Sequence, residues 1–124
     1  MSKKKTVLIV DDDQDIRDVL SIFLKDKDYY VISAESPSIS LRLLQELKID
    51  LLISDLAMPG MNGFDFIKLV CLTLEEKDRP KIIIYTGYKD MLASEPTFQN
   101  VDKVIDKSTN IREVIQEITA LLET

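Results

Sequence analysis

Apolar residues gather in five short runs along the chain, and apolar and polar residues recur at helical spacing between them. Most of these runs are apolar almost throughout instead of alternating with polar residues. That pattern is typical of strands covered on both faces of a parallel sheet. The predicted strands are Thr6–Val10, Tyr29–Ser33, Leu51–Ser54, Lys81–Tyr85 and Lys103–Ile105.

The stretch after the first run predicts an amphipathic helix. Its apolar residues follow the i, i+3, i+4, i+7, i+8 spacing of one buried stripe, made of Ile16, Val19, Leu20, Phe23 and Leu24. After the second run, Ser36 followed by Pro37 predicts an N-cap with proline at the first helical position. That helix is expected to continue to about Leu47.

Two more helices are predicted from the residues at which they start. Asn62 and Gly63 introduce a helix over residues 64–74. Asn110 with Glu113 gives a capping-box-like start to the last helix. The apolar stripe of that last helix consists of Ile111, Val114, Ile115, Ile118, Leu121 and Leu122.

Strands and helices therefore alternate along the whole chain. This alternation predicts a doubly wound α/β fold, in which right-handed crossovers place helices on both faces of a parallel sheet. Five helices are expected, and the fourth, over residues 88–95, is short because Pro96 ends it. The sequence contains no internal repeat and no interdomain linker, so residues 1–124 are expected to form one domain.

Composition narrows the classes of protein to consider. The chain has 45% apolar and 31% charged residues, a globular balance, and its net charge of −6 argues against nucleic-acid binding. No apolar run approaches the ~18 residues of a membrane span, so no membrane insertion is expected. Cys71 is the lone cysteine, which favours a reducing, cytoplasmic location. Histidine is absent, so any chemistry must come from carboxylates, hydroxyls and amines.

The residues that directly follow the predicted strands form a chemically distinctive set. In a doubly wound sheet, ligands bind beyond the carboxyl ends of the strands. Asp11 and Asp12 follow the first strand and Asp55 follows the third. Thr86 follows the fourth strand and Lys107 lies just after the fifth. Acids, a hydroxyl and an ammonium group are therefore expected at one edge of the sheet.

These groups suit phosphoryl chemistry supported by a metal ion. Two like charges 4 Å apart cost ~4 kcal/mol at an effective dielectric constant of ~20, and a hard divalent cation such as Mg²⁺ removes that cost. An ammonium and a hydroxyl group stabilise a phosphoryl group while an oxygen nucleophile attacks it in line. A carboxylate is the natural nucleophile here, since aspartyl phosphates are established covalent species.

Four stretches resemble the receiver domain of two-component response regulators, of the single-domain chemotaxis type. They are VLIVDDDQDIR, DLLISDLAMPGMNGFDFI with its D-x-x-M-P-x-M-N-G pattern, KIIIYTG and VIDK. The resemblance extends over essentially the whole chain. The resemblance implies a flavodoxin-like five-stranded parallel sheet in the order 2-1-3-4-5, which places the first and third strands side by side.

The resemblance also implies a role for each site residue. Asp55 would accept the phosphoryl group, and Thr86 and Lys107 would contact the phosphoryl oxygens. Mg²⁺ would be bound by the carboxylates of Asp12 and Asp55 and the backbone carbonyl of Ala57, while Asp11 holds a metal-bound water. The chain would then catalyse only its own phosphorylation and dephosphorylation.

The implied partners are proteins. A sensor histidine kinase or a histidine phosphotransfer protein, or a small phosphodonor, would supply the phosphoryl group, and a downstream target protein would bind the phosphorylated form. Two alternatives stay open. The chain could be a receiver-fold binding module that acts without phosphorylation, or the excised N-terminal receiver of a larger regulator.

Other acidic motifs fit less well. Asp13 and Asp15 lie where a helix N-cap and a favourable helix-dipole interaction are expected, so they are assigned to capping and not to metal binding. An EF-hand loop beginning at Asp11 is excluded, because Ile16 and Ile22 occupy the positions of its glycine and glutamate. A haloacid-dehalogenase-type Asp-x-Asp phosphatase would leave the D-x-x-M-P-x-M-N-G stretch without a purpose.

Four positions depart from the usual receiver pattern. Ser108 stands where proline usually follows the lysine, and Val104 stands where many receivers have Tyr or Phe. Because of these two differences, phosphorylation is expected to occur, but its effect on the face formed by the fourth helix, fifth strand and fifth helix is expected to differ from that in receivers with an aromatic residue at this position. Ala57 and Tyr88 are at the positions that flank the path of the hydrolytic water. Alanine cannot orient water and tyrosine blocks it, so a long-lived phosphorylated form is predicted.

Overall fold

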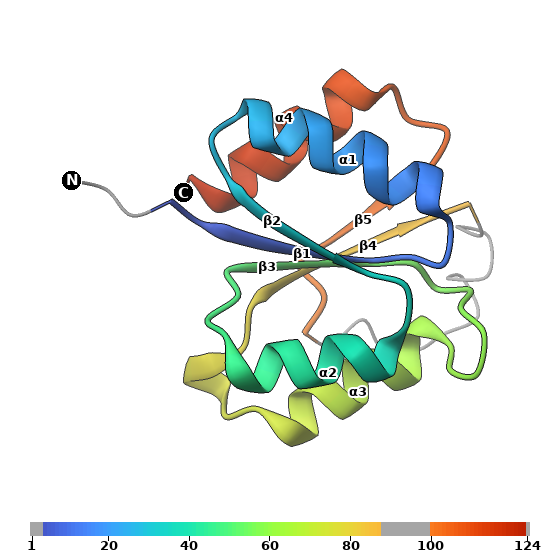
Figure 1. Cartoon of the computed structure of the whole chain (residues 1–124), viewed down its shortest axis with the longest axis vertical. Coiled ribbons are helices and arrows are strands. Elements are labelled where there is room, and N and C mark those ends of the chain that lie inside the picture. Colours follow the sequence, from blue (N-terminus) through green and yellow to red (C-terminus); the bar gives the residue numbers. More distant parts are fainter. Residues whose placement is uncertain (1–3, 88–99, 124) are drawn as a thin grey trace.

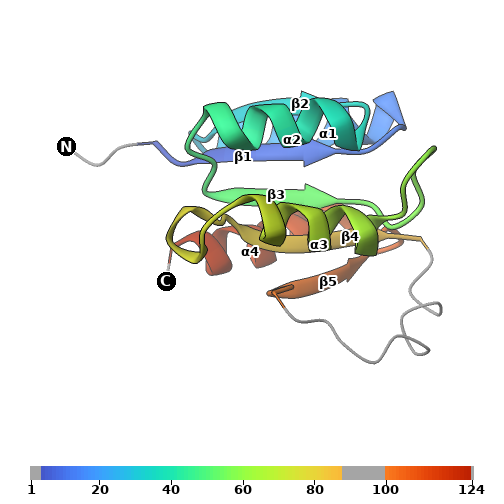
Figure 2. The ribbon, with the colours of Figure 1, turned by 90° about the horizontal axis from the view of Figure 1, so that it is seen from below.

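The computed structural model describes residues 4–87 and 100–123, and within them the sheet has the predicted topology. Five parallel strands are hydrogen-bonded in the order β2-β1-β3-β4-β5, which confirms the order expected from the receiver resemblance. Figure 2 shows the strands in this order. Their bounds are β1 Thr6–Val10, β2 Tyr30–Ala34, β3 Leu51–Ser54, β4 Lys81–Thr86 and β5 Lys103–Asp106.

Helices cover both faces of this sheet. In Figure 1, α1 and α4 lie on one face while α2 and α3 lie on the other. Their bounds are α1 Gln14–Asp26, α2 Pro37–Glu46, α3 Gly63–Thr73 and α4 Ile111–Leu122, and a short 3₁₀ helix, η1, spans Glu76–Asp78. The helix predicted over residues 88–95 falls outside the described residues. Among those described, no helix is long and apolar enough to cross a bilayer.

A polar side chain caps the start of each of the four described α-helices. In each case its oxygen accepts a hydrogen bond from a backbone N–H in the first turn, a group that has no partner within the helix. The capping residues are Asp13, Ser36, Asn62 and Asn110. The predicted starts of α2 and α4 are therefore confirmed, and so is the assignment of Asp13 to capping, whereas α3 begins at Gly63, one residue earlier than predicted.

The core consists of two apolar layers, one on each face of the sheet. Along β1, Val7 and Ile9 pack with α1 and α4, whereas Leu8 and Val10 pack with α2 and α3. All four side chains are at most 1% exposed. Burial on both faces explains why the strand sequences are continuously apolar.

Strand β2 begins one residue later than predicted. Asp28 has a left-handed backbone conformation, with φ of 69°, in the turn that ends α1. The Tyr29 N–H then donates to the Leu24 carbonyl, so Tyr29 still belongs to that turn. Sheet pairing starts at Tyr30, whose N–H donates to the Lys5 carbonyl.

The C-terminal end of α4 is bonded to the amino-terminal ends of the strands, whereas the acids lie at their carboxyl ends. Lys81 Nζ donates to the Leu121 carbonyl over 2.7 Å, and Lys5 Nζ donates to the Leu122 carbonyl. Positive charge beside the last carbonyls of a helix is favourable, because those groups carry the negative end of the helix dipole. These two hydrogen bonds fix the C-terminal end of α4 against the amino-terminal ends of β1 and β4.

Candidate functional site

Two aspartates lie side by side because their strands are neighbours. Asp11 directly follows β1 and Asp55 directly follows β3, and the two strands pair with Val10 opposite Ser54. The Asp55 N–H donates to the Val10 carbonyl over 3.2 Å, which extends this pairing to the acid itself. Both carboxylates are buried, with Asp11 2% and Asp55 5% exposed.

Asp12 completes a cluster of three carboxylates. One oxygen from each of Asp11, Asp12 and Asp55 lies within 4.8 Å of the others. Asp12 is exposed to solvent, in contrast to the other two. The sequence prediction that these three acids converge is therefore confirmed.

Lys107 neutralises part of this charge. Its Nζ lies 2.8 Å from Asp11 Oδ2 and 2.8 Å from Asp55 Oδ2, and its side chain is 21% exposed. The same Nζ is 6.0 Å from the centroid of the Tyr85 ring, a cation–π distance. Lys107 follows β5, which is separated from β3 by β4, yet its ammonium group contacts the acids at the carboxyl ends of both β1 and β3.

A short turn after β5 holds Lys107 in place. Asp106 Oδ1 accepts hydrogen bonds from both the backbone N–H and the hydroxyl of Ser108, each over 2.8 Å. The Lys107 N–H donates to the Thr86 carbonyl over 2.9 Å, and the peptide bond before Ser108 is trans. Serine in place of the usual proline thus closes the turn through its own hydrogen bonds, and Lys107 still reaches the acids.

The charges at the site influence one another. Burial raises the pKa of the Asp11 carboxyl, and the nearby charge of Asp55 adds to the rise, whereas hydrogen bonds from Lys107 and the Asp13 N–H act in the opposite direction. Burial by itself lowers the pKa of Lys107, but its contacts with Asp11 and Asp55 outweigh burial and leave that pKa raised. Lys107 is therefore charged at neutral pH.

Backbone donors orient the Asp55 carboxylate. Its Oδ1 accepts from the Leu56 N–H over 2.7 Å and from the Ala57 N–H over 3.4 Å, so Oδ1 and Oδ2 have different partners. Ala57 itself is exposed at the start of the following loop. Its role as a carbonyl ligand stays a prediction.

Of the two hydroxyl-bearing residues named in the sequence predictions, the structure describes Thr86 but not Tyr88. Thr86 is the last residue of β4, is fully buried and lies opposite Asp106 of β5, while its predicted contact with the phosphoryl oxygens stays a prediction. Tyr88, the residue expected to flank the path of the hydrolytic water, lies outside the described residues. The predicted long life of the phosphorylated form therefore stays a prediction.

Two structural residues of the site were missed at the sequence level. A Cβ at Gly63 would lie 2.4 Å from the Asp55 carbonyl oxygen, so only glycine lets α3 begin against this loop. Arg17 Nη1 donates to the Asp11 carbonyl over 2.6 Å, which ties α1 to the end of β1. The sequence identifies Gly63 as a turn residue, but nothing in it shows the close approach.

The donor set fits a magnesium ion. The three clustered side chains offer carboxylate oxygens and the Ala57 carbonyl would add another oxygen, which is the ligand type that Mg²⁺ prefers. Mg²⁺ commonly binds through one or two carboxylates together with waters and phosphate oxygens. Three acids against one lysine leave an excess of negative charge. A divalent cation would offset that excess.

Comparison with known proteins agrees with this geometry. Residues 7–119 match the family described as response regulator receiver domain. Transcriptional regulatory protein YdfI of Bacillus subtilis is 38% identical over 91 residues, covering 72% of this chain and 41% of YdfI. ResD of the same organism is 32% identical over 117 residues, covering 94% of this chain and 47% of ResD. The chain thus spans about half the length of such curated relatives.

Solved structures give the same result for the fold. Response regulator TrrA of Thermotoga maritima, in complex with Mg(2+)-BeF, has a TM-score of 0.83 and 30% identity, covering 95% of this chain and 99% of TrrA. Chemotaxis response regulator CheY4 of Vibrio cholerae has a TM-score of 0.85 and 26% identity, covering 97% of this chain and all of that one.

Proposed function

Because the chain belongs to the response regulator receiver family, we propose that it is a Mg²⁺-dependent phosphoacceptor switch of a two-component phosphorelay. The observation that carries the proposal is the gathering of Asp11, Asp12 and Asp55 with ligand oxygens within 4.8 Å, next to the Lys107 ammonium group. Receiver domains in general have histidine kinases as partners. TrrA, a relative of similar structure, was solved with Mg(2+)-BeF, which supports the same chemistry here.

Asp55 is the proposed phosphoacceptor. One of its carboxylate oxygens forms a bond to phosphorus while the bond from phosphorus to the donor breaks, and the electron pair of that bond leaves with the donor group. The donor is a phosphohistidine of a partner kinase or phosphotransfer protein, or a small acyl phosphate. The Leu56 N–H holds Asp55 Oδ1 at 2.7 Å, so the carboxylate is oriented before the donor arrives.

Lys107 and Thr86 are proposed to receive the phosphoryl oxygens. In the described structure the Lys107 ammonium contacts Asp55 Oδ2, and it can exchange that partner for a phosphoryl oxygen without leaving the site. Asp12, Asp55 and the Ala57 carbonyl are the proposed Mg²⁺ ligands, with Asp11 binding a coordinated water. When bound, the ion supplies positive charge that stabilises the transferring phosphoryl group.

The switch acts through charge. An aspartyl phosphate carries about 1.5 to 2 negative charges where the Asp55 carboxylate carried one, and it places them on a larger group at a buried strand end. This change biases the surrounding loops between two arrangements. We propose that a downstream protein binds one arrangement more tightly. Val104, half-buried in β5 against the core layer of α2 and α3, provides no aromatic side chain to report the change.

Phosphorylation by a small donor tests the proposal. Wild-type chain, incubated with acetyl phosphate and Mg²⁺, is expected to gain the mass of a single phosphoryl group. Asp55→Asn is expected to gain none, while Asp13→Asn, which changes the neighbouring helix cap, gains it as wild type does. If neither acetyl phosphate nor a panel of histidine kinases phosphorylates the wild type, a receiver-fold binding module that acts without phosphorylation is the better account.

A further inference from the structure

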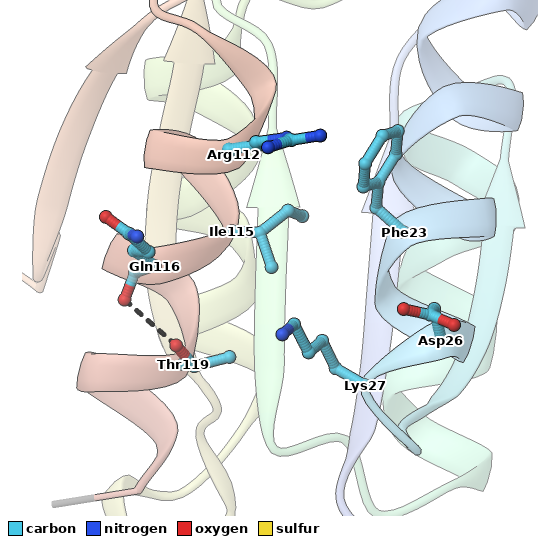
Figure 3. Close-up of a pocket in the computed structure, with 7 residues that line it drawn as sticks. All are labelled: Phe23, Asp26, Lys27, Arg112, Ile115, Gln116 and Thr119. Atoms are coloured by element: carbon cyan, nitrogen blue, oxygen red, sulfur yellow. Dashed lines mark hydrogen bonds between the residues drawn. The ribbon is translucent and has the colours of Figure 1, made fainter.

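A groove between α1 and α4 lies away from the acid site and has no part in the proposed phosphorylation. It has a volume of about 400 Å³, within the usual range for binding sites. Side chains from the two helices face each other across it (Figure 3). It is lined by Phe23, Asp26, Lys27, Arg112, Ile115, Gln116 and Thr119.

The middle of the groove is apolar. Ile115, only 3% exposed, lies between the helices, and Phe23 stands opposite it with 36% of its surface exposed. Exposed apolar side chains continue along α1, where Val19 is 43% and Ile22 is 67% exposed. A run of exposed apolar side chains beside a groove is typical of a surface that binds another protein.

The two ends of the groove are positively charged. Figure 3 shows Arg112 reaching from α4 toward Phe23, and the Lys27 ammonium group pointing toward α4 at the other end. Within residues 4–87 and 100–123, neither group has a carboxylate oxygen within 4 Å. Asp26 is the one acid in the lining, so two positively charged side chains are set against one carboxylate there. The groove is thus locally cationic on a chain of net charge −6.

We propose that this groove binds an acidic amphipathic helix of a partner protein. Arg112 and Thr119 are seven residues apart on α4, which corresponds to about 10 Å, or two helical turns. The partner helix places apolar side chains between Phe23 and Ile115 and a carboxylate at each end, against Arg112 and Lys27. This is helix-in-groove recognition, with charge complementarity selecting the partner.

A titration with designed peptides tests the groove. Isotope-labelled full-length chain is titrated with helical peptides of about 15 residues that carry Glu at i and i+7 and Leu, Met or Phe at i+3 and i+4. Saturable shifts are expected in the backbone amide signals of Phe23, Ile115 and Thr119. A Lys27→Glu/Arg112→Glu double variant is expected to bind about tenfold more weakly, and peptides with Gln in place of Glu about fivefold more weakly.

Lys25→Glu is the matched control, since it makes the same charge change on α1 outside the lining residues, and it is expected to leave affinity within about twofold. All variants should gain the phosphoryl group from acetyl phosphate as wild type does, so failure here is distinct from failure of the phosphorylation proposal. Absence of groove shifts at about 1 mM of every peptide would overturn the inference. Equal binding of the Gln peptides would also overturn it, as would self-association of the chain that the double variant abolishes.

Discussion

At the residue scale, the Lys107 ammonium group determines how two buried carboxylates coexist. Lys107→Met leaves Asp11 and Asp55 close together without their shared counter-charge. Urea denaturation at neutral pH is expected to show a loss of about 2–3 kcal/mol in the free energy of unfolding. Removing one partner of a fully buried ion pair costs ~3–5 kcal/mol. The expected loss is slightly smaller here because the Lys107 side chain is 21% exposed.

The Lys107→Met loss should depend on pH. Burial already raises the pKa of Asp11, and removing Lys107 raises it further, so lowering the pH protonates the acid and reduces the deficit. Lys103→Met is the control, since the Lys103–Glu117 pair at 3.0 Å is more exposed; its expected cost is below about 1 kcal/mol. A Lys107→Met deficit that stays constant down to acidic pH would contradict the charge argument.

Gly63 is a second residue on which the site depends. An alanine Cβ there would lie 2.4 Å from the Asp55 carbonyl oxygen and 2.8 Å from the Leu56 Cα, so the backbone must move. Gly63→Ala is expected to lower the free energy of unfolding by about 2 kcal/mol and to slow phosphorylation by acetyl phosphate. Gly87→Ala, with no atom within 4 Å of the added Cβ, should leave stability nearly unchanged. Equal stabilities of the two variants would refute the close approach.

At the element scale, one hydrogen bond links the turn before β2 to the end of α4. The Tyr29 hydroxyl donates to Glu123 Oε1 over 2.9 Å. Burial, the hydrogen bond to Glu123 and the charge of Glu123 raise the pKa of Tyr29 to about 12. An unfolded tyrosine ionises near pH ~10, so the stability that Tyr29 contributes is fully present below that pH and is lost between about pH 10 and 12.

Tyr29→Phe tests this link. The variant is expected to lose about 1 kcal/mol at neutral pH, because the hydrogen bond is gone, and to lose less stability than wild type between about pH 10 and 12. Tyr30→Phe is the control, since Tyr30 is 58% exposed and its ring, which Lys4 approaches at 5.1 Å, is retained. Thermal unfolding of all three proteins across that pH range measures both effects.

At the scale of the whole molecule, ion binding at the sheet edge should be visible as stability. A ligand that binds only the folded chain stabilises it by RT ln(1 + [L]/Kd), about 1.8 kcal/mol at a concentration near 20 Kd. MgCl₂ is therefore expected to raise the Tm of wild type by several degrees. Asp12→Asn should lose most of the rise, and Asp13→Asn should keep it because Asp13 caps α1. Equal shifts in both variants would remove Asp12 from the ligand set.

The element order and the helix starts were predictable because their causes are local. Ser36 with Pro37 and Asn62 with Gly63 mark helix starts by capping chemistry that acts within one turn. The continuous apolar runs marked strands buried on both faces. The start of β2 was misplaced by one residue, because the left-handed conformation of Asp28 keeps Tyr29 in the turn that ends α1.

Sequence alone determined which residues follow the carboxyl end of each strand, because this depends only on where each apolar run stops. Distances between strands were decided by the fold. Pairing of β1 with β3 brings Asp11 and Asp55 together across 44 residues of chain, and Lys107 reaches both from a turn that Asp106 and Ser108 close. The groove of Arg112 and Lys27 likewise exists only where α1 and α4 pack on one face of the sheet. Contacts of this kind depend on packing between distant segments, which a local pattern cannot specify.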